Sequence, residues 1–95
     1  MSVFAFRYVY DDANAAKMDE LRPLHRGYLG EGAKHDIVLA SGPFTSGEGA
    51  LILVKAKDEK EATDFMNQDP FYKNGMVVDR SCREWKSVLG AFTDC

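Results

Sequence analysis

Two stretches of this chain are apolar on both alternating faces, which restricts how a sheet built from them can be covered. In Val3–Tyr10, four aromatic residues alternate with Val3, Ala5 and Val9, and only Arg7 breaks the second set. A second strand is expected over Ala50–Ala56, where Leu51–Val54 is apolar at every position. Because successive side chains point to opposite faces of a strand, both faces of a sheet containing these strands must be shielded from water.

The first helix is placed by its proline. Asp11–Asn14 is expected to end the first strand, and the stretch up to Leu21 is expected to hold a helical turn. Proline fits the first turn of a helix, where its missing N–H costs no hydrogen bond. The main helix is therefore predicted from Pro23 to about Lys34, with Arg22 as its N-cap. Ser, Thr, Asp or Asn would cap it better, which suggests that Arg22 contacts an anion or substrate.

The remaining elements follow from turn and cap signals. Ile37–Ser41 is predicted as a strand ended by Gly42 and Pro43. Asp58 and Glu61 form a capping-box-like start to a second helix, which is expected to end near Asp69 because Pro70 blocks its continuation. A fourth strand is predicted from Met76 through Trp85 towards Val88, and Leu89–Cys95 is left as a tail.

The order strand, helix, strand, strand, helix, strand predicts an α+β fold of the ferredoxin-like βαββαβ type over residues 1–95 as one domain. Its four-stranded antiparallel sheet would carry both helices on one face. The other face also needs a cover. A second copy of the chain, packed sheet against sheet, is the simplest one, and a homodimer is therefore favoured. The alternative is a tail or loop folded across that face.

Composition narrows the possible partners. The net charge is −3 and the twelve Lys and Arg residues are scattered, which argues against nucleic-acid and anionic-membrane partners. The first residues lack a basic segment followed by a long apolar run, and no run reaches membrane-spanning length, so a cytoplasmic protein is expected. Cys82, Cys95 and the two histidines show no metal-ligand spacing, so neither a metal site nor a disulfide is expected.

The topology brings two ionisable residues together. The start of the first helix should lie beside the end of the second, and helical spacing from Leu21 and from Met66 turns His25 and Asp69 inward. A helix N-terminus disfavours an imidazolium, so His25 is expected to be neutral. Asp69 could accept its hydrogen bond, fix the tautomer and support a general base. Alternatively, His25 is a satisfied core histidine and Asp69 a common turn starter before proline.

Other residues are candidates for a pocket at the same edge of the sheet. Each also has a structural explanation: strand-end bonding for the serine, turn geometry for the glycine and proline, packing for the aromatic rings, and a surface ion pair for the arginine. The candidate substrate-binding residues are Arg22, Ser41, Gly42, Pro43, Phe44 and Phe71.

Four short motifs, taken in order and spacing, resemble the YCII-related family over nearly the whole chain. They are Arg22-Pro23-Leu24-His25, Ser41-Gly42-Pro43-Phe44, Asp69-Pro70-Phe71 and Arg83-Glu84-Trp85-Lys86. The resemblance implies a dimeric α+β barrel in which His25 and Asp69 correspond to the family's proposed catalytic His–Asp pair, near the dimer interface. It also implies elimination or isomerisation of small, often aromatic or dienone-type compounds without an organic cofactor.

Two regions depart from the family's usual pattern, namely the glycine-rich helix segment Gly27–Gly32 and the short loop Thr45–Gly49. Both border the expected pocket and bear on its size.

The residues and the family resemblance together suggest three functions. The first is a small lyase- or isomerase-type enzyme in which neutral His25, oriented by Asp69, moves a proton on a small substrate while Arg22 holds an anionic group. The second is a non-catalytic dimer that binds a small metabolite, with the pair serving only to satisfy a buried polar site. The third is a cofactor-independent monooxygenase, a class that shares the dimeric barrel. Fold alone does not choose between them.

Overall fold

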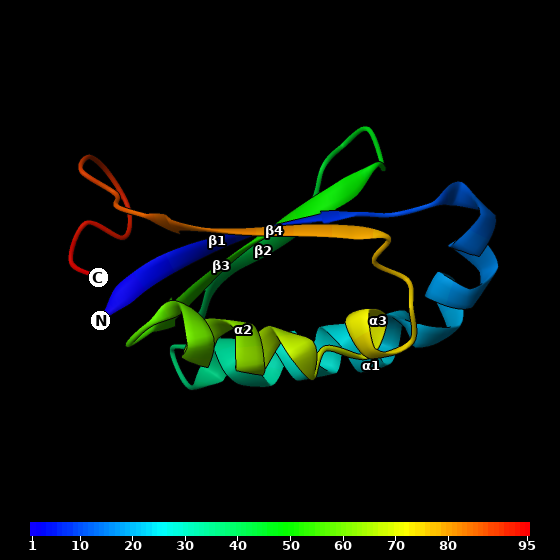
Figure 1. Ribbon diagram of the computed structural model, residues 1–95, viewed down its shortest axis with the longest axis horizontal. Coiled ribbons are helices and arrows are strands. Elements are labelled where there is room, and N and C mark those ends of the chain that lie inside the picture. Colours follow the sequence, from blue (N-terminus) through cyan, green and yellow to red (C-terminus); the bar gives the residue numbers. More distant parts are fainter.

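The computed structural model describes residues 1–95 as a four-stranded antiparallel sheet with the helices packed on one of its faces (Figure 1). The strand order is β2-β3-β1-β4, which confirms the predicted ferredoxin-like topology. The strands are β1 (Ser2–Val9), β2 (Val38–Pro43), β3 (Gly49–Ala56) and β4 (Asp79–Trp85). The helical elements are η1 (Asp12–Asn14), α1 (Ala15–Lys34), α2 (Glu59–Asn67) and α3 (Pro70–Lys73). No helix has both the length and the apolar character required to cross a membrane.

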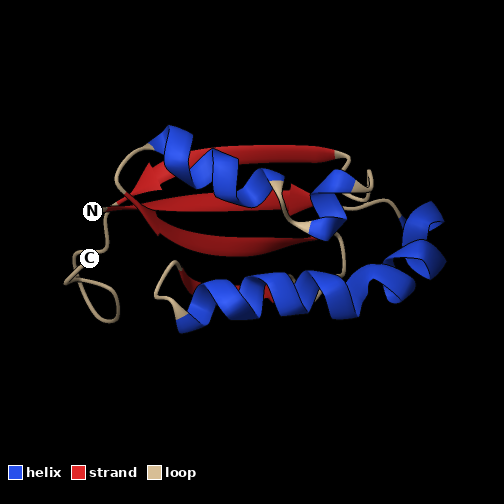
Figure 2. Ribbon diagram, turned by 90° about the horizontal axis from the view of Figure 1, so that it is seen from below, coloured by secondary structure: helices blue, strands red, loops and turns tan.

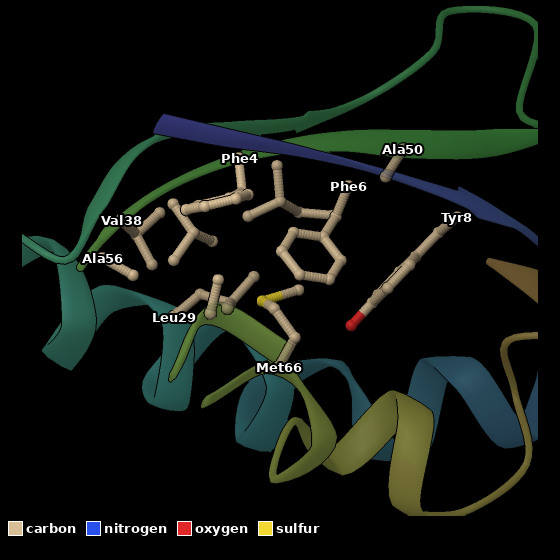
Figure 3. Packing of buried hydrophobic residues seen from close by; sticks show 11 residues of the cluster. Phe4, Phe6, Tyr8, Leu29, Val38, Ala50, Ala56 and Met66 are labelled. Carbon is tan, nitrogen blue, oxygen red and sulfur yellow. The ribbon is translucent and has the colours of Figure 1, made fainter. Parts of the chain in front are cut away.

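The core lies between the sheet and the helices. Phe4, Phe6 and Tyr8 of β1 stand opposite Val54, Ile52 and Ala50 of β3, and all six are buried. Figure 3 shows these β1 side chains pointing at α1 and α2, where Leu29 and Met66 meet them. Burying one large apolar side chain stabilises a fold by roughly 1.5–3 kcal/mol, so this interface is the main support for the two layers.

Helix α1 begins eight residues earlier than the sequence predicts. It starts at Ala15 and continues through Pro23, so the prediction of a new helix at Pro23, capped by Arg22, is wrong. Buried residues recur at helical spacing on both sides of the proline: Met18, Leu21, His25, Leu29 and Gly32. Packing along this continuous face compensates for the hydrogen bond that proline cannot donate. Figures 1 and 2 show the first part of α1 tilted away from the axis of the rest, as expected for a helix that contains a proline.

The second helical region is divided into two helices. Asp58 caps α2 as predicted, because its side chain accepts a hydrogen bond from the backbone N–H of Glu61 at 2.9 Å. The helix ends at Asn67, and Pro70 then occupies the first turn of the new short helix α3. Asp69 is thus the N-cap of α3, not the last residue of α2, which corrects the earlier placement. In Figure 2, α2 and α3 lie beside α1 beneath the sheet.

Two strands also have different bounds from those expected. Strand β2 extends to Pro43 and pairs with Ala50 of β3 at that end. Strand β4 starts at Asp79 and stops at Trp85. The preceding Met76 is buried against α1 and α3, so the apolar residues predicted to begin the last strand form part of the helix-side core.

The sheet face opposite the helices is only partly covered. Val3 is 4% exposed on this face, and the C-terminal segment lies nearby, with Phe92 lining the same hollow as Val3 and Trp85. Trp85, which pairs with Val3 at this same end, is still 42% exposed, and further along the face Leu51 is 41% exposed. Figure 1 shows the segment after β4 confined to one end of the sheet, beside the N-terminus. The tail predicted as an alternative cover therefore shields one end of the face and leaves an apolar region open.

Candidate functional site

A buried carboxylate lies at the centre of the candidate site. Asp69 is 0% exposed and accepts three hydrogen bonds from separate parts of the chain. One oxygen accepts from the Nδ1 of His25 at 2.7 Å and from the backbone N–H of Phe71 at 3.1 Å. The other oxygen accepts from the hydroxyl of Tyr8 at 2.8 Å. A buried carboxylate is costly unless its lone pairs are occupied, and here each oxygen has at least one donor.

The three donors come from elements that the core already fixes. Tyr8 is on the helix-facing side of β1, next to Phe6 in the core. His25 lies on the buried face of α1, four residues after Leu21 and four before Leu29. The backbone N–H of Phe71 is free because it belongs to the first turn of α3, where no intrahelical acceptor exists. The carboxylate therefore joins the sheet, the long helix and the short helix at one point.

His25 is held on two sides. Its ring stacks on that of Phe71, with ring centroids 4.0 Å apart and planes 10° from parallel. Its Nδ1 contacts Asp69, so a neutral imidazole carries its proton on Nδ1 and leaves the lone pair on Nε2. Nε2 makes no hydrogen bond within the chain, and the ring lines a groove. A base with a fixed tautomer thus faces an open space.

The groove has a volume of about 400 Å³ and runs between α1 and β2. Helix α1 contributes Arg22, His25 and Arg26, followed by residues towards its C-terminal end, and β2 contributes Val38–Pro43 along its whole length. Tyr10 and Phe71 add two aromatic rings, which meet edge to face at 5.8 Å. A space of this size, mostly apolar with a few polar groups, suits a small organic molecule.

Two tyrosines beside the carboxylate resist ionisation. The pKa of the Tyr8 hydroxyl is raised well above its usual range, first by burial and then by the negative charge of Asp69 and their hydrogen bond. Burial, with a smaller contribution from Asp69, raises the pKa of Tyr10 to about 12. Both phenols therefore remain protonated around neutral pH, and Tyr8 stays a hydrogen-bond donor to Asp69.

The structure brings together most of the residues predicted for the site. His25 contacts Asp69, and Arg22, Ser41, Gly42, Pro43 and Phe71 all line the groove. Phe44 does not, because it follows the last residue of β2 and lines a separate shallow hollow with Leu51 and Leu53. Its inclusion is corrected.

The placement of His25 and Arg22 at a helix start is wrong. His25 lies in the middle of α1, so the argument from a helix N-terminus does not apply to it. Arg22 is also inside the helix, where it forms an ion pair with Asp19, and its guanidinium carbon lies 5.9 Å from the centre of the Phe71 ring. The His25–Asp69 pair forms because α3, whose N-cap is Asp69, packs against α1.

Sequence reasoning missed two members of the site. Tyr8 was assigned to the apolar face of its strand, and the only signal for another role was a hydroxyl at a position that must be buried. Arg26 follows His25 directly and lines the groove. As for metals, no group of three or more His, Cys, Asp or Glu side chains lies close enough to hold an ion, so the pair itself offers two ligands at most.

Comparison with known proteins places the chain in a family. The YCII-related domain matches residues 3–86. The chain belongs to the YCII-related family. No curated protein matches it.

Among solved structures, this YCII-related protein is similar to the 5-chloro-2-hydroxyhydroquinone dehydrochlorinase TftG of Burkholderia phenoliruptrix AC1100, in complex with 2,5-dihydroxybenzoquinone. The TM-score is 0.77 at 19% sequence identity, over 88% of this chain and 93% of that one. At this level of identity the likeness establishes the shared fold, and the activity of the dehydrochlorinase is a property of that protein.

Proposed function

We propose that this YCII-related protein is a small enzyme of the lyase or isomerase type, in which His25 and Asp69 perform general acid–base chemistry on a small ring compound. One observation carries the proposal: Nδ1 of His25 is bonded to a buried carboxylate while Nε2 has no partner in the chain and the ring lines a groove. This is the arrangement that general-base catalysis requires, because the base is oriented and its lone pair is free.

The proposed step begins with removal of a proton from a carbon next to a carbonyl group by Nε2. The electron pair of the broken C–H bond moves into the ring, and His25 becomes an imidazolium that the carboxylate of Asp69 stabilises. In an elimination, this electron pair forms a C=C bond and expels a leaving group such as halide from the neighbouring carbon, and the imidazolium then passes its proton to solvent. In an isomerisation, the imidazolium returns the proton to a different carbon. Neither route requires an oxidant or an organic cofactor.

The groove supports a flat substrate. His25 and Phe71 are stacked, and Tyr10 meets Phe71 edge to face, so aromatic surfaces lie beside the base. Arg22, at 5.9 Å from the Phe71 ring, is proposed to hold an anionic group, and Ser41 and the Gly42–Pro43 backbone to form the opposite wall.

The three hydrogen bonds that Asp69 accepts favour a second candidate function, small-molecule binding without catalysis. This carboxylate also caps α3 and satisfies Tyr8, which are structural tasks. A protein that only binds a small molecule could retain the same cluster for stability. It would bind ligands in the groove and release them unchanged.

The test uses the variant His25→Asn, whose side-chain amide can still donate to Asp69 but provides no base. His35→Asn is the matched control, because His35 is exposed at the end of α1. Substrates are halogenated hydroxyhydroquinones and dienelactones, and products are measured as released halide and by mass spectrometry. Loss of a positioned general base costs about 10²–10⁴-fold in rate. Unchanged turnover in His25→Asn would refute the proposal, and binding without any product in the unmodified protein would establish the second candidate.

We also propose a homodimer formed through the open sheet face. The uncovered apolar region around Leu51, on the face opposite the helices, supports this assembly, because such a surface is unfavourable in water.

A further inference from the structure

The lining of the groove is unusually one-sided in charge. Arg22, His25 and Arg26 all line it, and no Asp or Glu does. Two carboxylates lie nearby without lining the groove: Asp69 is fully buried and its oxygens are occupied, and the exposed Asp19 pairs with Arg22. The chain as a whole carries a net charge of −3, so the groove is a local positive region on an acidic protein.

The two arginines differ in what neutralises them. Arg22 forms an ion pair with Asp19. The side chain of Arg26 forms no ion pair and no hydrogen bond within the chain. Its helical neighbours three and four residues away are Arg22, Pro23, Leu29 and Gly30, so no acid on α1 can reach it at those positions.

The spacing of the arginines is itself unfavourable. Two cations four residues apart on a helix repel each other, which destabilises the helix slightly. A second element of the fold does not relieve the repulsion, because the β2 residues that face α1 across the groove, Val38–Pro43, contain no acid. An anion in the groove would remove it.

We infer that Arg26 determines the ligand class of this groove, by selecting a flat ring that bears an anionic oxygen group such as a carboxylate. The inference rests on the proposed function for the placement of the ring, which the apolar and aromatic lining would hold beside His25. Arg26, which no acid neutralises, then binds the charged substituent at the edge of the ring beside the Asp19-paired Arg22, while Nε2 of His25 faces a ring carbon. A planar guanidinium matches the two oxygens of a carboxylate, so the contact also orients the ring.

The test compares two probes of the same size and shape, the anionic 4-hydroxybenzoate and the neutral 4-hydroxybenzamide. Each probe is titrated into the ¹⁵N-labelled protein, and its dissociation constant is obtained from the NMR shifts of the backbone amides of Gly30 and Gly42, which line the groove. The unmodified protein is expected to bind the benzoate more tightly. Arg26→Gln is expected to weaken benzoate binding about tenfold and to leave benzamide binding nearly unchanged, because one hydrogen-bonded charge contact is lost.

Two further variants serve as controls. Lys17→Gln makes the same charge change at an exposed position of α1 that does not line the groove, and it should retain the preference for the benzoate. Arg26→Lys keeps the charge without the planar fork, and it should retain part of the preference. If Arg26→Gln behaves like Lys17→Gln, or if the unmodified protein binds the two probes equally, the inference is wrong.

These outcomes are separate from those of the proposed function. His25→Asn should lose turnover but still prefer the benzoate, since Arg26 is intact. If His25→Asn abolishes turnover while Arg26→Gln changes neither dissociation constant, only the role of Arg26 is refuted. If the unmodified protein prefers the benzoate through Arg26 but shows no turnover, only the catalytic proposal is refuted.

Discussion

Removing the hydroxyl of Tyr8 is the most direct way to measure how much the buried carboxylate depends on its neighbours. In Tyr8→Phe, the ring remains in the core beside Phe6 and no cavity is created. The variant deletes one donor, the hydroxyl that lies 2.8 Å from an oxygen of Asp69. Tyr8 and Asp69 are both 0% exposed, so water has no access to replace the bond. The change is therefore confined to one polar contact.

The magnitude follows from the charge and the burial. Hydrogen bonds to charged groups contribute about 1.5–3 kcal/mol, and an unsatisfied buried acceptor costs a similar amount. We expect Tyr8→Phe to lower the free energy of unfolding by about 2 kcal/mol. Tyr28→Phe is the matched control, because that hydroxyl donates to the neutral backbone carbonyl of Phe65 at 2.7 Å in a half-buried position. Its loss should cost only about 0.5–1 kcal/mol.

Urea unfolding followed by circular dichroism measures both variants. With a slope of about 1 kcal/mol per molar urea, the midpoint of Tyr8→Phe should fall by about 2 M and that of Tyr28→Phe by at most half as much. The protein concentration is held constant, because association would change the apparent stability. Equal midpoints for the two variants would refute the reasoning that Tyr8 supports Asp69 in a desolvated cluster.

A pH series gives the same prediction an independent readout. The pKa of Tyr8 is raised in the folded state, so above pH 10 the unfolded chain loses a proton that the folded chain keeps. The stabilisation due to Tyr8 is therefore complete below about pH 10 and declines as the pH rises, by at most about 1.4 kcal/mol per pH unit. Tyr8→Phe lacks this contribution. The stability difference between the unmodified protein and Tyr8→Phe should narrow between pH 10 and pH 11, and a constant difference would contradict the shift.

Three further predictions concern glycines and the open face. In thermal unfolding, Gly27→Ala should raise the free energy of unfolding by about 0.5–1 kcal/mol, because a methyl group there meets nothing within 4 Å. Gly32→Ala should lower it, because the new Cβ would lie 2.7 Å from the Phe65 ring. Gly30→Leu should abolish binding of 4-hydroxybenzoate in the NMR titration without unfolding the chain, because Gly30 lines the groove and has open space beside it. In sedimentation equilibrium, the unmodified chain should have the mass of a dimer and Leu51→Lys that of a monomer. The same mass for the variant and the unmodified chain would reject the sheet-face assembly.

The fold could be predicted from the sequence because its signals are local and agree with one another. Alternating aromatic residues mark β1, the capping box at Asp58 marks α2, and together they specify the order of elements. The predicted start of α1 at Pro23 is wrong, because the preference of proline for the first turn of a helix is a local one and takes no account of tertiary packing. The long-range packing of residues before and after the proline decided the outcome, and no local pattern measures that energy.

The site was predictable only in outline. Spacing turned His25 and Asp69 inward, and topology brought them to the same edge, although the assumed helix ends were wrong. The third partner, Tyr8, could not be found, because a buried tyrosine in an aromatic strand has the same pattern whether or not its hydroxyl meets a carboxylate. Phe44 was included because it follows the glycine and proline in sequence, yet the chain leaves the groove after Pro43.

Because Asp69 accepts three hydrogen bonds, only some variants can distinguish its structural role from a catalytic one. Its carboxylate caps α3, holds the imidazole of His25 and satisfies the hydroxyl of Tyr8, so replacing it by alanine would disturb three elements at once. A loss of activity in such a variant has no single explanation, because buried polar networks lose stability when any member is left unpaired. Nε2 of His25 is different, since nothing in the chain depends on it. The variant His25→Asn removes Nε2 and the stacking of the ring on Phe71 while it leaves a donor to Asp69 in place, so its free energy of unfolding is measured beside its turnover to separate lost packing from lost chemistry.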